Sequence, residues 1–440
     1  MNLSRNLPSL SPAYARYALT VLFAVNLFNY IDRQIVFGVF PLIQTDLALS
    51  DSALGLLGSA FMVLYMLASV PLGMAGDRWA RNKLIALGVA VWGAATFLSG
   101  LARSFGQLFV TRALVGIGEA SYGPTATAMV SDYFPKRRRG FVNALFTAAI
   151  PLGGALGVAI GGNVGDRFGW RPAFLVVGLP SLLLAVLAWR LVDPPRGASE
   201  PAPAAGPDGP TALAVLPVAG WALSQRIQWL FRIPTFVLVC AVGMLIAFAT
   251  GAFTAWLPTY LYRVKGLSLA TATNWYGGIL SLGGCLGVLA GGVIGDALVR
   301  RTPAGHLLTI AFGFLASAPL GLLFLLHRAP QVYLPALFGA VFFLVLYMGI
   351  VNATIHNVVH PELRATAIAI FVLLIHLGGD AFSPAIVGLI SDRRSLQGAM
   401  LLLPVLVFFA GVIALAASGV VAADAKRLER DLVRRPAIGR

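Results

Sequence analysis

Charged side chains are scarce in this sequence: Asp, Glu, Lys and Arg make up 11% of its 440 residues, whereas 58% are hydrophobic. A soluble core of this size could not hide so much apolar surface, which excludes a soluble globular protein. The only cysteines, Cys240 and Cys285, form no disulfide framework and lack the spacing of a metal site. No Gly-x-x-x-x-Gly-Lys-Ser/Thr loop is present, which argues against ATP as a driving force.

Long apolar stretches fill most of the chain. Twelve of them reach roughly 20 residues or more, enough to cross a hydrocarbon core about 30 Å thick. They lie at 17–42, 52–76, 83–102, 106–132, 141–163, 171–192, 235–262, 273–296, 306–326, 331–357, 364–391 and 396–422. We therefore expect an all-α integral membrane protein with twelve transmembrane helices.

A glycine, three residues and an aspartate recur four times at the ends of apolar stretches. The pairs are Gly73 and Asp77, Gly162 and Asp166, Gly292 and Asp296, and Gly388 and Asp392. The residue before each aspartate is small, so each motif offers a face on which two helices can approach closely. The spacing indicates four three-helix units with an insert in the middle, as in transporters whose repeats rock around a central site.

The repeats divide the chain. We expect a six-helix bundle at 1–192, a cytoplasmic linker at 193–234, a second six-helix bundle at 235–422 and a basic cytoplasmic tail at 423–440. The linker is rich in Pro, Ala and Gly, a composition that stays flexible. Its end, 221–231, has the pattern of an amphipathic helix on the inner leaflet.

The net charge of +15 does not indicate nucleic-acid binding, because the basic residues are not gathered on one soluble face. Most Lys and Arg instead lie in loops on the side that holds both termini. The positive-inside rule then predicts a multi-pass protein of the cell inner (plasma) membrane with both termini cytoplasmic. Residues 1–16 are polar and no cleavage site follows, so we expect the first helix to be retained.

The loop at 73–83 joins the end of one helix to a cluster of basic residues. Asp77 can accept hydrogen bonds from a neighbouring helix N-terminus, while Arg78 and Arg81 stay in solvent. The loop resembles the signature of the major facilitator superfamily, with Asn82 in place of one usual basic residue. A weaker echo follows in the second half. The conformational latch that we predict consists of Gly73, Asp77, Arg78, Arg81, Asp296 and Arg300.

Three further segments, 29–33, 112–122 and 376–384, resemble the spinster family of lipid transporters within that superfamily, and 169–171 and 256–260 fit the same family. The resemblance implies the major facilitator fold, with two pseudo-symmetric six-helix bundles, each built from inverted three-helix repeats. It also implies proton-coupled movement of an amphipathic molecule, such as a lysophospholipid or sphingosine phosphate, by alternating access. It implies neither an enzyme nor a cofactor.

Ionisable residues inside an apolar span are costly and are functional candidates by default. Arg112 and Glu119 are seven residues apart on one helix, so they share a face and lie roughly 10 Å apart. Asp32 could reach Arg112, which gives an Asp-Arg-Glu cluster. Protonating a carboxylate would release Arg112, and in the spinster family the matching residues are the coupling residues. The alternative is a static ion-paired brace. Arg33 is either a second cavity charge or the partner of a neighbouring span.

The second half offers His376 and Asp380, one helical turn apart. They could bind a polar headgroup or titrate, or they could form a local hydrogen bond that shapes the helix before Pro384. The full set of tentative substrate residues is Arg33, Tyr122, Trp256, Asn352, His376 and Asp380, although aromatic residues near span ends are often interfacial anchors. We expect no metal, because Asn357 and Pro361 spoil the zinc-helix spacing of two nearby histidines.

Other classes of protein remain as alternatives. An intramembrane lipid enzyme could use Asp32, Glu119 and His376 as acid and base, but no nucleophile elbow or metal cluster accompanies them. A channel or receptor also fits the composition. Within the transporters, the alternative is a proton-coupled symporter or exporter of small organic anions or drugs, with Arg112 binding a carboxylate. The expected partners are the substrate, protons and membrane lipids, with no nucleic acid, and we expect a monomer.

Overall fold

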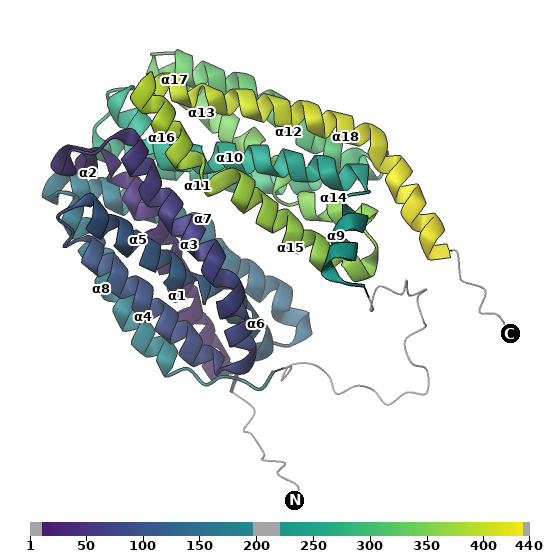
Figure 1. The fold of residues 1–440 in the computed structure, drawn as a ribbon, viewed down its shortest axis with the longest axis horizontal. Coiled ribbons are helices and arrows are strands. Elements are labelled where there is room, and N and C mark those ends of the chain that lie inside the picture. The colour runs from purple at the N-terminus through teal and green to yellow at the C-terminus, as the bar shows by residue number, and fades with distance from the viewer. Residues whose placement is uncertain (1–10, 197–220, 434–440) are drawn as a thin grey trace, which may run out of the picture. The chain divides into compact units, whose positions relative to one another are not determined.

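The computed structural model describes residues 11–196 and 221–433, except the side chains of Asp77, Pro124, Lys136 and 431–433. Within these ranges every regular element is a helix (Figure 1). Ten helical segments are long and apolar enough to cross a membrane. The predicted spans 17–42 and 106–132 are also helical; the first contains ionisable residues and the second is broken in the middle. The described residues thus form the expected all-helical membrane protein.

The chain divides into two units. Most of unit 1 comes from the first half of the chain, together with Ser268–Asn274; unit 2 takes Leu49–Ser59 and most of the second half. The units thus differ from the predicted bundles at two helices: the first turns of α3 (Asp51–Arg78) belong to unit 2 and those of α11 (Leu269–Val299) belong to unit 1.

The helices of the first half are α1 (Pro12–Gly38), α2 (Phe40–Leu47), α3 (Asp51–Arg78), α4 (Arg81–Ser99), α5 (Phe105–Ala120), α6 (Gly123–Tyr133), α7 (Lys136–Phe168) and α8 (Trp170–Trp189). In unit 1, α1 packs along α7 and α4 packs along α8, as Figure 1 shows for the second pair. Glycines allow this close packing. A side chain at Gly157 or Gly161 of α7 would collide with the backbone of α1, which is how small residues join helices in lipid.

The second half begins with α9 (Leu223–Leu230), α10 (Pro234–Arg263), α11 (Leu269–Val299), α12 (Gly305–Leu326), α13 (Pro330–Leu344), the 3₁₀ turn η2 (Val345–Tyr347) and α14 (Val351–Val358). It continues with the 3₁₀ turn η3 (Pro361–Leu363), α15 (Arg364–Ile375), the π turn η4 (His376–Asp380), α16 (Ser383–Arg393), α17 (Leu396–Met400) and α18 (Leu402–Val433). In unit 2, α18 packs beside both α10 and α12 (Figure 1).

Several predicted spans are interrupted rather than continuous. Breaks separate α1 from α2, α5 from α6, and α15 from α16. A proline opens the helix after each of these breaks: Pro41, Pro124 and Pro384. Proline lacks a backbone N–H and suits the first turn of a helix but not its interior. Broken helices in transporters expose backbone groups where substrates and ions bind.

The linker and tail are partly described. Helix α9 lies at the end of the predicted linker, and its proline-rich part, 201–210, falls outside the described residues. Helix α18 continues into the predicted tail, 423–440, and ends at Val433.

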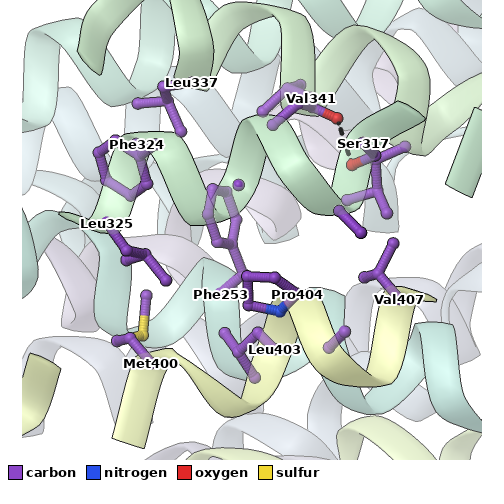
Figure 2. A pocket seen from close by; sticks show the side chains of 15 residues that line it. Phe253, Ser317, Phe324, Leu325, Leu337, Val341, Met400, Leu403, Pro404 and Val407 are labelled. Atoms are coloured by element: carbon purple, nitrogen blue, oxygen red, sulfur yellow. Dashed lines mark hydrogen bonds between the residues drawn. The ribbon is translucent and has the colours of Figure 1, made fainter. Parts of the chain in front are cut away.

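Unit 2 contains a partly open apolar cavity of about 40 Å³ between α10, α12, α13, α17 and α18. Figure 2 shows Phe253, Leu403 and Val407 lining it. The hydroxyl of Ser317 donates a 2.8 Å hydrogen bond to the carbonyl of Ala340, so the polar group of this wall is already satisfied.

Candidate functional site

Asp32 of α1 and Arg112 of α5 form a buried ion pair in unit 1. Arg112 donates hydrogen bonds of 3.2 and 3.3 Å to Oδ1 of Asp32, and both side chains are almost fully buried. Thr96 of α4 donates to the other carboxylate oxygen and accepts a 3.0 Å bond from Arg112. Ser99 accepts a further bond of 3.3 Å from Arg112. Buried charges persist only when they are paired and hydrogen-bonded, and this site meets both conditions.

Arg33 and Glu119 form a second ion pair between the same two helices. Nε and Nη2 of Arg33 donate bonds of 3.3 and 3.1 Å to Oε2 of Glu119. The Glu119 side chain has no exposed surface, whereas 18% of the Arg33 side chain is exposed. The rings of Tyr30, Phe61 and Tyr65 have their centroids 4.7 to 5.2 Å from Cζ of Arg33. Such rings attract a desolvated guanidinium, so they hold Arg33 in an aromatic wall.

The sequence placed Asp32, Arg112 and Glu119 in one cluster, but the structure divides them. Arg112 pairs with Asp32, whereas Glu119 pairs with Arg33. Consecutive residues point about 100° apart around a helix. Asp32 and Arg33 of α1 therefore contact α5 at two different positions along its length. Arg33 is thus the partner of a neighbouring span, and its 18% exposed side chain leaves its role as a second cavity charge open.

Two atoms at this site have unmet hydrogen-bonding capacity. Among the described residues, Oε1 of Glu119 and Nε of Arg112 are buried without a hydrogen-bond partner. Buried polar groups are rarely left unsatisfied, and the exceptions often have a chemical role. The pairs of charges are therefore not a fully satisfied brace.

Sequence reasoning missed the residues that surround these pairs: Tyr30, Phe61, Tyr65, Thr96 and Ser99. Thr96 and Ser99 are three residues apart and therefore share one face of α4. That signal becomes informative only once α4 is known to lie beside α5. The aromatic residues carried no signal that would separate them from ordinary packing residues.

Tyr122 lies in the core of unit 1. It is 2% exposed, and its hydroxyl donates a 2.6 Å bond to the carbonyl of Leu22. Its ring packs edge-on against Trp92 at 5.8 Å. Because its polar group and its ring are both engaged inside the bundle, we leave Tyr122 out of the proposed substrate residues.

His376 and Asp380 lie together in unit 2, within the π turn that interrupts the predicted span 364–391. Nδ1 of His376 is 3.0 Å from both carboxylate oxygens of Asp380, and the two side chains are 27% and 21% exposed. Sequence reasoning expected an ordinary α-helical turn here; the π turn was not foreseen. A side chain at Gly251 of α10 would collide with Asp380, so glycine permits the close contact. Single π turns occur frequently at functional sites.

The other two candidates of unit 2 differ from each other. Trp256 of α10 is fully buried, and its Nε1 donates a 2.9 Å bond to the carbonyl of Pro384. It therefore supports the break before α16, and its burial removes it from the proposed substrate residues. Asn352 is exposed near the start of α14 and stays a candidate.

The signature loop at 73–83 differs from expectation at Arg81. Instead of lying in solvent, Arg81 is buried, with Nη1 2.6 Å from Asp132 and Nε 2.8 Å from Asp193. Its Nη2 also donates a 2.6 Å bond to the carbonyl of Pro194. Arg81 thus ties the start of α4 to the end of α6 and to the segment after α8, and the two carboxylates balance its charge.

The other latch candidates whose side chains the structure describes have few contacts. Arg78 is exposed in the last turn of α3, as expected, and the Asp77 side chain lies outside the described part of the chain. A side chain at Gly73 would meet nothing within 4 Å. In the second half, 76% of the Asp296 side chain is exposed, with His306 Nε2 3.6 Å away, and Arg300 is exposed.

The fourth Gly-x-x-x-Asp motif builds a polar network within unit 2. Asp392 accepts bonds of 2.8 and 2.9 Å from the backbone N–H groups of Asp51 and Ser52, the first residues of α3. Asp51 in turn accepts bonds from Ser391 at 2.5 Å and from Arg263 at 2.8 Å. The aspartate thus meets a helix N-terminus, the arrangement that the sequence suggested for Asp77.

Metal ligation finds no support in the described ranges, 11–196 and 221–433. No group of three or more His, Cys, Asp or Glu residues there could hold a metal ion.

Comparison with known proteins relates this architecture to transporters. The family model of the Major Facilitator Superfamily matches residues 22–379. The protein spinster of Drosophila melanogaster is 34% identical over 388 residues, which cover 86% of this chain and 62% of the fly protein. Human protein spinster homolog 1 is 34% identical over 411 residues, 88% of this chain and 75% of the human protein.

Solved structures have the same fold. A bacterial homolog of the human lysosomal transporter Spinster, in an inward-facing and unoccupied conformation, superposes with a TM-score of 0.78 at 24% identity, over 98% of this chain and 100% of that one. A nucleoside transporter superposes with a TM-score of 0.66 at 12% identity, over 93% of this chain and 99% of that one. The chain therefore belongs to the spinster family of the major facilitator superfamily and is a multi-pass membrane transporter.

Proposed function

We propose that this transporter couples the movement of protons to the movement of an amphipathic lipid, such as a lysophospholipid or a sphingosine-phosphate-like molecule, by alternating access. The observation that carries the proposal is the buried Arg33–Glu119 pair, in which one carboxylate oxygen has no partner. Protonating Glu119 removes the charge that holds Arg33. The partly exposed guanidinium can then bind an anionic headgroup.

The second pair has a different part in this mechanism. Asp32 accepts hydrogen bonds from Thr96 and Arg112, so its charge is better supported than that of Glu119. Arginine does not usefully lose its proton, which leaves the carboxylates as the proton carriers. We therefore assign proton coupling to Asp32, Arg112 and Glu119, with Glu119 as the first group to be protonated.

The chemistry of the partly exposed groups favours a lipid. Arg33 offers a guanidinium, the preferred partner of a phosphate, within a wall of Tyr30, Phe61 and Tyr65. In unit 2, the π turn with His376 and Asp380 adjoins an apolar groove of about 520 Å³. The groove is lined by Ala241, Met244, Leu245, Phe248, Gly378, Leu402, Leu406 and Ile413. A polar headgroup site beside apolar surface suits an amphipathic substrate.

We further propose that the protein works as a monomer in the cell inner (plasma) membrane, with both termini cytoplasmic, and catalyses no reaction. The asymmetric distribution of Lys and Arg supports the orientation. Gly73, Asp77, Arg78, Arg81, Asp296 and Arg300 form the proposed latch, in which the buried Arg81 supports the loop and the exposed Arg78 is available for conformation-dependent contacts.

Uptake of a labelled lysophospholipid into proteoliposomes with an imposed pH gradient tests the function. The wild type is compared with Glu119→Gln and Asp32→Asn. Glu429→Gln is the matched control, because it changes the same chemistry at an exposed position of α18. We expect the gradient to increase wild-type and control uptake several-fold, and both site variants to lose most of that response.

Two outcomes would contradict the proposal, one its lipid substrate and the other its proton coupling. Transport of small organic anions but of no lysophospholipid would remove the lipid assignment and favour the anion or drug transporter. Lipid transport with equal rates in the presence and absence of the gradient would remove proton coupling.

A further inference from the structure

A small pocket with charged residues in its lining lies at one end of unit 2, where α9 meets α18. It has a volume of about 150 Å³ and contains two arginines and a tryptophan. Its lining residues are Trp229, Arg232, Ile233, Val358, Asp424, Arg427 and Leu428. The residues involved in the proposed transport are all outside it.

The two arginines of the pocket are available to a ligand. Among the described residues, the guanidinium of Arg232 makes no hydrogen bond or ion pair, and the side chain is exposed. Nη1 of Arg427 lies 3.8 Å from Oδ1 of Asp424, too far for a hydrogen bond, and 67% of the Arg427 side chain is exposed. Both arginines therefore keep their donors free for an anion.

Asp424 does not cancel this positive charge at the open side of the pocket. Its side chain is 5% exposed, and Oδ2 accepts bonds of 2.9 and 2.7 Å from the backbone N–H and the hydroxyl of Thr235. The carboxylate thus caps the start of α10. Lys426 and Arg430, also exposed on α18, add positive charge nearby.

The lengths of the adjoining spans indicate that the pocket lies near the depth of lipid headgroups. It adjoins Pro234, the first residue of the apolar span Pro234–Arg263. Along the axis of α18, Asp424 lies about 33 Å from the first residue, Leu402, at 1.5 Å per residue. This distance is close to the thickness of a hydrocarbon core. Helix α9 carries a half-buried Trp229 and a buried Leu230, a composition typical of a helix at the membrane interface.

We propose that this pocket binds the phosphate of an anionic phospholipid from the surrounding bilayer. Arg232 and Arg427 bind the phosphate oxygens as charge-assisted hydrogen-bond donors, and Trp229 lies at the level of the glycerol. Basic pockets at the ends of membrane helices bind anionic headgroups in this way. Because its arginines come from the segment between α9 and α10 and from α18, the bound lipid joins that segment to α18 within unit 2.

Thermal unfolding of the purified full-length protein in detergent tests this site. The protein is titrated with phosphatidylglycerol, phosphatidylcholine or glycerol 3-phosphate, for the wild type and for Arg232→Gln/Arg427→Gln. Arg137→Gln/Arg138→Gln is the matched control, because it removes two exposed arginines from α7. A ligand that binds only the folded state raises Tm. We expect phosphatidylglycerol to raise the Tm of wild type and control by about 3 °C or more, and the pocket variant to lose most of this shift.

Three results would overturn the proposal. Equal shifts with phosphatidylglycerol and phosphatidylcholine would show that charge is not recognised. A full shift in Arg232→Gln/Arg427→Gln would place the lipid elsewhere. An equal shift with glycerol 3-phosphate would identify a site for a soluble phosphate rather than for a lipid.

A second measurement covers the case in which the pocket variant does not fold. Brominated phosphatidylglycerol quenches nearby tryptophans, so we expect it to quench wild-type fluorescence more than that of Trp229→Phe. Equal fractional quenching of the two proteins would contradict the assignment.

Discussion

Arg33 directs both Nε and Nη2 at a single oxygen of Glu119, while the other oxygen is buried without a partner in the described structure. The carboxylate is therefore held from one side only. Removing its cation leaves a charge with no other strong partner, whereas adding a proton neutralises it in place. The contribution of this pair to stability can be measured by unfolding, independently of transport.

Arg33→Gln should destabilise the protein, because it leaves Glu119 as an uncompensated buried charge. Breaking a buried pair costs about 3–5 kcal/mol. The double variant Arg33→Gln/Glu119→Gln should recover at least half of that loss, because no charge is then buried alone. Thermal unfolding of the wild type, both single variants and the double variant gives the coupling energy. A double variant no more stable than Arg33→Gln would show that the pair does not set the stability of this site.

Thr96→Val should weaken the neighbouring Asp32–Arg112 pair. The hydroxyl donates to Asp32 and accepts from Arg112, and valine has a similar shape but no polar group. Losing bonds to buried charged groups costs about 1.5–3 kcal/mol. Thr309→Val is the control, because within the described residues this buried threonine bonds only the carbonyl of Gly305 in its own helix. Chemical or thermal unfolding should show the larger loss for Thr96→Val; equal losses would contradict the bridging role.

The sequence was sufficient to find the charged residues of the site but not their pairing. So few charges occur in the apolar spans that Asp32, Arg112 and Glu119 stood out. Which arginine meets which carboxylate depends on the rotation of α1 against α5, and that rotation is set by packing with α4 and α7. Proline follows each break but does not by itself predict one, because Pro71, Pro151 and Pro258 lie inside helices that continue without a break.

Other features depend on contacts between distant parts of the chain. Arg81 looked like a solvent-exposed member of a basic loop, and its partners, Asp132 and Asp193, are 51 and 112 positions away. Nothing in the local sequence indicates that burial. The π turn at His376–Asp380 could not be predicted for a related reason. Within it, Gly379 lies so close to α10 that a side chain there would collide with that helix, and α10 is far away in the sequence.

Two variants of the signature loop should have different effects: Arg81→Gln should lower the stability of the protein, and Arg78→Gln should lower its transport rate. Arg81→Gln removes the buried cation that pairs with Asp132 and Asp193 and should cost about 2–5 kcal/mol. Arg78 is exposed, so Arg78→Gln should change stability by less than about 0.5 kcal/mol. If Arg78 belongs to the latch, its variant should still lower the transport rate. Thermal unfolding and transport, measured on the same preparations, test both parts, and equal destabilisation by the two variants would contradict the structural role of Arg81.

Asp392→Asn should destabilise the start of α3. The carboxylate accepts from two backbone N–H groups at a helix N-terminus, where a negative charge is favoured. The amide keeps one acceptor and loses the charge, so we expect a cost of about 0.5–2 kcal/mol. The control is Asp46→Asn, because Asp46 is 42% exposed in a surface pair with Arg171, a kind of pair worth about 0–1 kcal/mol. Hydrogen exchange at the first turn of α3 should rise in Asp392→Asn only; unchanged exchange there would show that the carboxylate does not hold this turn.

Leu403→Ala should enlarge the cavity of unit 2. Leu403 is 4% exposed on α18, and its side chain forms part of the apolar wall shown in Figure 2. Truncating a buried leucine loses both its transfer free energy and its packing contacts, at about 2–5 kcal/mol. Leu415→Ala is the control on the same helix. Leu415 is 49% exposed, so about half of its side chain contacts lipid rather than protein, and its truncation removes fewer packing contacts. Thermal unfolding should show a several-fold larger loss for Leu403→Ala. Equal losses would mean that the cavity wall collapses around the smaller side chain, since the cost of such substitutions depends on how fully the neighbours relax.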